Sequence, residues 1–208
     1  MNNINIKDKI AAYHPFNRQE EEDKKLLLRA IDEFEDIFSR DNQMMHFTSS
    51  CYILNEKKDK VLFCYQNIYK SYSWLWGHAD GNWDLLQVAI KEAEEESGIK
   101  VKPLLKDIFS IESLTVDGHI KNNRYVSSHL HLNVTYLLQG DEKEKLRVKE
   151  DENSSLRWFS FSQTLSEPDE RWMIDNIYKK LYDKLICLKK EKKIWSVWGE
   201  IFLTDHLI

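Results

Sequence analysis

The stretch "GHADGNWDLLQVAIKEAEEESGI", residues 77–99, has the features of a helix with defined ends. Asp84 followed by Gln87 has the form of a capping box, in which a short acceptor side chain begins a helix. Gly98 supplies the left-handed residue that ends many helices. Four apolar residues between these ends recur at helical spacing and should pack against a sheet: Leu86, Ala89, Ile90 and Ala93.

The same helix carries a dense group of carboxylates near its end. Glu92, Glu95 and Glu96 are spaced i, i+3, i+4 and should converge on one face, whereas Glu94 points more towards solvent. Like charges this close repel one another, so either solvent or a cation must offset them. Magnesium prefers oxygen ligands and leaves positions for substrate phosphates. A solvated helix face is the alternative, and the glycines Gly77 and Gly81 in the preceding loop favour a ligand site because they allow close backbone approach.

Composition excludes some classes of protein. The chain has 208 residues and a net charge of −5, so it offers no polycationic surface to nucleic acid or acidic membranes. Its three cysteines form no C-x-x-C pair, and we find no signal peptide or membrane span in the sequence. These features predict a cytoplasmic protein that binds neither nucleic acid nor membranes.

Hydrophobic periodicity predicts an α/β (α+β) protein with three regions: a helical extension at 1–40, a domain at 41–188 and a tail at 189–208. The first region should hold one helix over 18–39. The domain should contain strands at 47–54, 61–65, 104–114, 126–138 and 157–159, followed by a helix from Pro168 to about Lys190. The tail is apolar enough to pack on the domain or on a partner, and with the long first helix it is consistent with a homodimer.

Three histidines are candidates for ligand contact. His129 and His131 alternate along a strand and so share one face with Asn133 and Thr135. That face either contacts a metal or a phosphate, or simply lines a cleft. His78 follows Gly77 directly. We predict that Gly77, His78, His129 and His131 bind substrate.

The acidic helix and its loop resemble the Nudix box of the Nudix hydrolases, G-x5-E-x7-R-E-U-x-E-E-x-G-U, where U is apolar. Laid on the chain without gaps, the pattern matches at these positions: Gly77, Glu92, Ala93, Glu95, Glu96, Gly98 and Ile99. Two positions differ, because Trp83 stands where the family has a glutamate and Lys91 where it has an arginine. Lysine keeps the charge but lacks the planar fork of arginine. Asp80 or Asp84 could partly replace the missing glutamate.

The resemblance implies a Nudix-type α/β/α sandwich with a mixed sheet, an extra N-terminal helix and a C-terminal extension. It also implies hydrolysis of a diphosphate bond in a nucleoside diphosphate linked to another moiety, with Mg²⁺ or Mn²⁺ as cofactor. Glu92, Glu95 and Glu96 would hold the metal, and Lys91 would pair with Glu92 or a neighbour. The water would be activated by a glutamate of this cluster or of the 150–152 loop, where Glu152 is our choice and loop solubility is the alternative.

A second functional class remains open. A Nudix-like module that binds a nucleotide without cleaving it, as a sensor or regulator, would explain the substitutions at Trp83 and Lys91.

Overall fold

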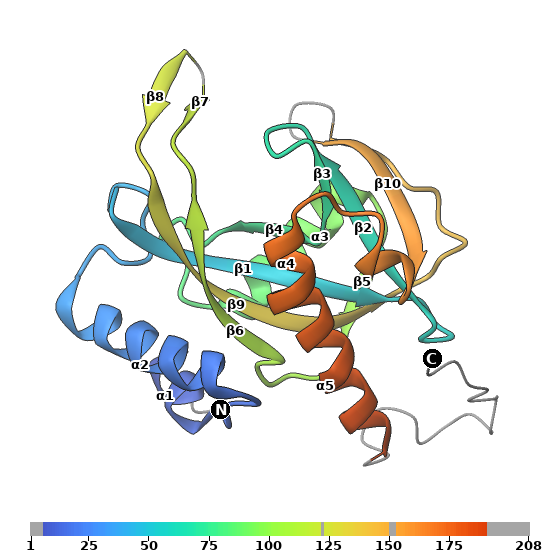
Figure 1. The fold of residues 1–208 in the computed structure, drawn as a ribbon, viewed down its shortest axis with the longest axis horizontal. Helices are drawn as coiled ribbons and strands as arrows, with labels where there is room; N and C mark the ends of the chain where they lie inside the picture. Colours follow the sequence, from blue (N-terminus) through green and yellow to red (C-terminus); the bar gives the residue numbers. More distant parts are fainter. Residues whose placement is uncertain (1–5, 122, 150–152, 191–208) are drawn as a thin grey trace.

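The structure is a computed structural model that describes residues 6–121, 123–149 and 153–190 (Figure 1). Its strands are β1 (Met45–Leu54), β2 (Lys60–Gln66), β3 (Ser71–Ser73), β4 (Leu75–His78), β5 (Val101–Pro103), β6 (Ser110–Val116), β7 (His119–Lys121), β8 (Arg124–Val126), β9 (His129–Gly140) and β10 (Asn153–Ser160). Its helices are α1 (Ile6–Ala12), α2 (Arg18–Glu33), α3 (Leu85–Ser97), the 3₁₀ turn η1 (Gln163–Leu165), α4 (Arg171–Met173), the π-helical segment η2 (Ile174–Tyr178) and α5 (Lys179–Lys190).

Eight strands form one mixed sheet. Five of them are hydrogen-bonded in the order β10–β2–β1–β9–β5. In addition, β3 pairs with β2, β4 with β1 and β6 with β9. The central pair β1 and β9 is parallel, and every other pair of this sheet is antiparallel. Strands β7 and β8 form a separate hairpin that projects from the body of the molecule (Figure 1).

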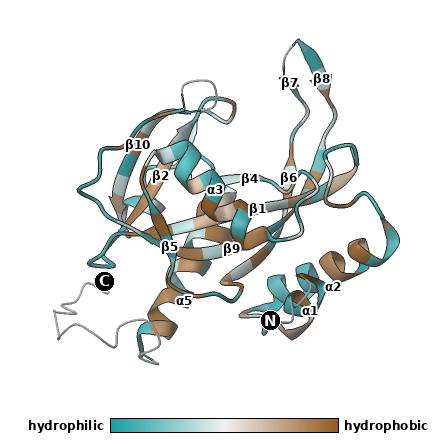
Figure 2. Cartoon of the chain, turned by 180° about the vertical axis from the view of Figure 1, so that it is seen from behind, coloured by the Kyte–Doolittle hydropathy of each residue, from teal (hydrophilic) through white to brown (hydrophobic). Residues whose placement is uncertain are grey.

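Alternate residues of the central strands pack into two cores on opposite faces of the sheet. Cys51 and Ile53 of β1 belong to the core beneath α3, whereas Tyr52 and Leu54 belong to the core beneath η2 and α5. Figure 1 shows α4 and α5 in front of the sheet, and Figure 2 shows α3 from behind. The chain is therefore an α/β/α sandwich, as predicted.

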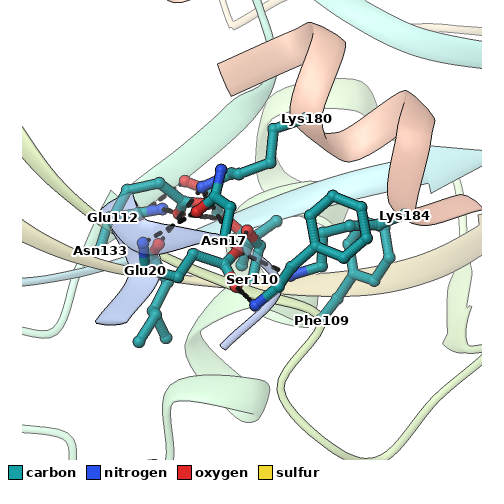
Figure 3. Close-up of polar contacts among 12 residues, drawn as sticks. Asn17, Glu20, Phe109, Ser110, Glu112, Asn133, Lys180 and Lys184 are labelled. Atoms are coloured by element: carbon teal, nitrogen blue, oxygen red, sulfur yellow. Dashed lines mark hydrogen bonds and ion pairs between the residues drawn. The ribbon is translucent and has the colours of Figure 1, made fainter. Parts of the chain in front are cut away.

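Helix α2 lies against strand β6, and α1 packs on α2 (Figure 1). Helix α2 begins at the N-cap Asn17, whose side chain accepts the Glu20 amide, and it carries both apolar and polar residues along its length (Figure 2). Glu20 is fully buried and pairs with Lys184 of α5 at 2.7 Å (Figure 3). An ion pair therefore joins the N-terminal and C-terminal helices.

Several predicted boundaries were wrong. The predicted strand at 104–114 begins only at Ser110, as β6, because the chain bends between Leu104 and Phe109, and the short strand β5 ends before that bend. Helix α2 ends at Glu33 rather than near Ser39, and α1 was not predicted. Within the described ranges no helix is long and apolar enough to cross a membrane. Most of the predicted tail, residues 191–208, lies outside the described residues.

Candidate active site

Helix α3 begins and ends where the sequence predicts. The Asp84 side chain accepts the backbone N–H of Gln87, and Gly98 ends the helix in the left-handed region at φ 73°. Two strand β1 side chains hold the helix against the sheet. Ser49 Oγ donates to the Leu85 carbonyl at 2.7 Å and Cys51 Sγ to the Ala89 carbonyl at 3.2 Å.

The buried face of α3 is rotated from the predicted one. Ala89 and Ala93 are buried as expected, but Leu86 and Ile90 are only partly buried at its edge. The row that includes Ala89 and Ala93 continues to Glu96, which is only 2% exposed. The three predicted metal-binding glutamates therefore differ in setting, because Glu96 points inward while Glu92 and Glu95 lie nearer the surface.

Gly77 and Glu92 meet at the contact between β4 and α3. A Cβ atom at Gly77 would lie 2.2 Å from Glu92 Cγ and 2.3 Å from its carboxyl carbon. Any other residue at position 77 would displace this carboxylate, whose side chain is 15% exposed. The glycine is therefore required by the position of Glu92.

Lys91 lies between two of the glutamates. Its Nζ is 3.6 Å from Glu92 Oε1 and 3.4 Å from Glu95 Oε2. Attraction to Glu92, and less to Glu95, raises the pKa of Lys91. Carboxylate oxygens are the ligands that hard divalent ions prefer, so Glu92 and Glu95 offer donors of the right kind for such an ion.

The other acidic side chains of this region differ in their surroundings. Glu94 points away from the cluster and pairs with Lys100 at 2.7 Å. Glu152 lies outside the described residues. Glu95 is the most open of the cluster, with 44% of its side chain exposed.

The loop before α3 is stabilised without the glutamate that the Nudix pattern has at position 83. Trp83 stacks on Phe38 with ring centroids 4.2 Å apart. Asp80 accepts two bonds from the Arg40 guanidinium, at 2.7 and 2.6 Å. Asp84 is the N-cap of α3, so Asp80 and Asp84 both have structural roles.

The predicted histidines gather on the other face of the sheet. Strand alternation directs Gly77 towards α3 and its neighbours Trp76 and His78 away from it. The His78 ring is 5.1 Å from that of His131, which in turn is 5.0 Å from that of His129. The predicted residues thus form two separate groups. Gly77 and the glutamates lie on one face of β4, and the histidines lie on the other.

A fourth histidine, which we did not predict, joins this group. His46 lies directly opposite His131 in the parallel pairing of β1 with β9, and its ring is 5.0 Å away. Burial lowers the pKa of His46 and lowers that of His131 much further. The alternation in "HFTSS", residues 46–50, was the sequence signal for His46, because it places His46 on the polar side of its strand with Thr48 and Ser50.

A pocket adjoins these histidines on the same face. Trp76 and His131 line it together with Thr48 and Ser50 of β1 and with Tyr69 and Glu170 from the loops opposite. Asn133 also lines it, and its side chain accepts from Ser50 Oγ at 2.7 Å and donates to Glu112 at 2.8 Å. The pocket thus combines aromatic and polar groups.

Comparison with known proteins agrees with this architecture. The family model described as NUDIX domain matches residues 44–184. The MutT protein from Methanosarcina mazei Go1 has 15% identity and a TM-score of 0.51, over 73% of this chain and 98% of that one. A NUDIX-family hydrolase from Clostridium perfringens has 21% identity and a TM-score of 0.48, over 66% and 96%.

A search of curated proteins gave no match. The family match covers well over half of the chain and includes the whole of β4 and α3. We conclude that this chain belongs to the Nudix family.

Proposed function

We propose that the protein is a divalent-metal-dependent hydrolase that cleaves a diphosphate bond in a nucleoside diphosphate linked to another moiety. The observation that carries this proposal is the contact between Gly77 and Glu92, beside the Lys91 ion pairs. This contact keeps the Glu92 carboxylate in place beside Gly77, at the start of the loop before α3, where a phosphate can approach.

Each residue of the cluster has a distinct role in this proposal. Glu92, Glu95 and Glu96 would hold Mg²⁺ or Mn²⁺, and the ion would offset charge on the phosphate oxygens and lower the pKa of its bound water. Lys91 orients Glu92 and Glu95 through its two ion pairs. Glu95, as the most exposed of the three, or Glu152 would accept the proton of the attacking water.

The substrate-binding residues divide between the two faces of β4. Gly77 belongs to the phosphate side, and His78, His129 and His131 would contact the rest of the substrate at the pocket. The Trp76 ring centroid lies 5.2 Å from that of His78 and 5.0 Å from that of His131. Trp76 also lines the pocket, where its ring could stack on a base.

The alternative is a module that binds a nucleotide without turnover. The substitutions at Trp83 and Lys91 favour it. The retained pairing of Lys91 with both Glu92 and Glu95 favours the enzyme, because the lysine still reaches the carboxylates that an arginine would orient.

The test is turnover of sugar nucleotides and dinucleoside polyphosphates by the purified chain with Mg²⁺ or Mn²⁺. Replacement of Glu95 by Gln should reduce kcat by about 100-fold or more, since it removes a metal-site carboxylate. The matched control is Glu94→Gln on the same helix turn, where only the Lys100 pair is lost and kcat should stay within about twofold.

Two results would contradict the enzyme. If the wild type binds a nucleotide tightly but turns over no compound of the panel with either metal, the binding module is favoured. If Glu94→Gln and Glu95→Gln reduce turnover equally, the converging carboxylates are not the catalytic cluster.

A further inference from the structure

We propose that His46, His129 and His131 form a binding site for a transition-metal ion of the Zn²⁺ class, separate from the carboxylate site. Each offers one nitrogen, and these nitrogens all lie within 4.8 Å of one another. Among the residues that the structure describes, no other group of three His, Cys, Asp or Glu side chains meets this criterion.

The backbone already orients two of the three rings. His46 Nδ1 is 3.0 Å from the Asn42 carbonyl, and His129 Nδ1 is 2.8 Å from the Ser127 carbonyl. A carbonyl only accepts, so both Nδ1 atoms carry hydrogen and both Nε2 atoms present lone pairs. Histidines that bind metals are oriented in this way by a backbone carbonyl on the second ring nitrogen.

The ring nitrogens that could bind a metal lie close to one another. His129 Nε2 lies 3.2 Å from His131 Nε2, which is close to the separation of about 3.3 Å between two nitrogens on one tetrahedral zinc. His46 Nε2 is buried and has no hydrogen-bond partner among the described residues. A buried acceptor without a donor is costly, and a metal ion at this point would remove that cost.

Metal binding requires one proton to move. In the metal-free protein, His131 Nε2–H donates to His129 Nε2, because His129 keeps its hydrogen on Nδ1. On binding, the His131 proton would transfer to its own Nδ1, and Nε2 would become the third ligand. The net charge of the protein is unchanged by this tautomer shift.

The donor set determines the class of ion. Three imidazoles suit zinc and its neighbours among the first-row transition metals, whereas magnesium requires oxygen donors. Three protein ligands also leave a fourth position open, as in catalytic rather than structural zinc sites. His131 also lines the pocket, so the proposed site adjoins the space that Trp76 and Thr48 line.

Cobalt provides the test, because Co²⁺ bound by imidazoles in a tetrahedral site absorbs visible light. The full chain, stripped with a chelator, is titrated with Co²⁺ in a large excess of Mg²⁺, which fills carboxylate sites. We expect one equivalent of Co²⁺ to give a tetrahedral spectrum, and Zn²⁺ to displace it. His46→Ala and His129→Ala should each weaken binding by about 100-fold or more.

Controls separate this site from the proposed active site and from loss of folding. His14→Ala replaces an exposed histidine and should leave the titration unchanged. Glu95→Gln should also leave it unchanged, whatever its effect on turnover. His129 is only half-buried, so His129→Ala should fold, and Zn²⁺ should raise the unfolding temperature of the wild type but not of this variant.

The proposal is overturned if no tetrahedral spectrum appears, if Glu95→Gln abolishes it, or if the histidine variants bind Co²⁺ as tightly as the wild type. Hydrolysis at the carboxylate cluster is measured separately, as turnover with Mg²⁺, so the two proposals can fail independently.

Discussion

Two lysine–glutamate clusters in this molecule use the same chemistry in opposite settings. On α3, Lys91 is 61% exposed and contacts Glu92 and Glu95 at 3.6 and 3.4 Å. Between α2, β6 and α5, Lys184 contacts Glu20 at 2.7 Å, and Lys180 contacts Glu112 at 3.0 Å (Figure 3). Both glutamates of this second cluster are completely buried.

The two clusters differ in how many hydrogen bonds the carboxylate oxygens accept from the rest of the protein. Glu20 Oε1 accepts from Ser110 and Lys184, and its Oε2 accepts from Tyr13 and the Phe16 amide, at 2.6–2.8 Å. These four bonds occupy the carboxylate from both sides. The α3 pairs are longer and open to water, so a ligand can replace them at little cost. A saturated cluster stabilises the fold, whereas an open one is available for function.

The strongest test of this contrast is to remove the buried charge of Glu20. Glu20→Gln leaves Lys184 buried without its main partner, and unpaired buried charges cost about 3–5 kcal/mol. We expect a loss of that size in the free energy of unfolding, measured by chemical denaturation. Glu22→Gln is the control on the same helix, because it removes an exposed pair with Lys25 and should leave the unfolding midpoint unchanged. Equal midpoints for both variants would contradict the structural role of the buried cluster.

The second test uses acid. Burial alone would raise the pKa of Glu20, but attraction to Lys184 and Lys180 outweighs it and lowers the pKa from 4.5 to about 2. The charged form is therefore favoured by folding, so its stabilisation is present above pH 4.5 and is lost as the pH falls towards 2. The wild type should lose about 2–3 kcal/mol relative to Glu20→Gln over this range.

The acid test compares the wild type with Glu20→Gln because the pKa of a second carboxylate, that of Asp23, is also shifted. Burial raises the pKa of Asp23 to about 6, so Asp23 contributes with the opposite sign between its ordinary value of 3.8 and 6. Its contribution cancels when the wild type and Glu20→Gln are compared at each pH. If the two unfolding curves stay parallel from pH 5 to pH 2.5, the low pKa of Glu20 is wrong.

The local parts of the fold were predictable because their signals lie within short segments. The capping residues and the helical spacing correctly predicted that α3 lies between Asp84 and Gly98. Period-two alternation correctly placed His129 and His131 on one face of β9. The α/β/α architecture and the family followed from the same segments and from the resemblance of residues 77–99 to the Nudix box.

The long-range contacts were not predictable from local patterns. Glu20 and Lys184 are 164 residues apart, and both lie on helices whose charged residues resemble a solvated face. A weak signal existed, because Lys180 and Lys184 fall three residues after Ile177 and Leu181 and so lie within the apolar stripe of the last helix. The partnership of His46 with His131 likewise depends on the β1–β9 register, which no short segment specifies.

The smallest expected effect concerns the open cluster itself. Gly77→Ala would place a methyl group within about 2.3 Å of the Glu92 side chain, so the carboxylate must move. Displacement of a catalytic group by about 1 Å can cost up to about 100-fold in rate, and we expect a 10- to 100-fold loss of turnover with most of the stability retained. Gly140→Ala is the matched control, since its methyl group would lie 2.7 Å from the end of the Ile99 side chain and make ordinary contacts with Ile53 and Val101, all of them away from Glu92. If both variants lose turnover in proportion to their loss of stability, sheet strain explains the result and Gly77 has no particular role at Glu92. If only Gly77→Ala loses turnover, the position of Glu92 limits the reaction, because the two substitutions differ in the side chain that they displace.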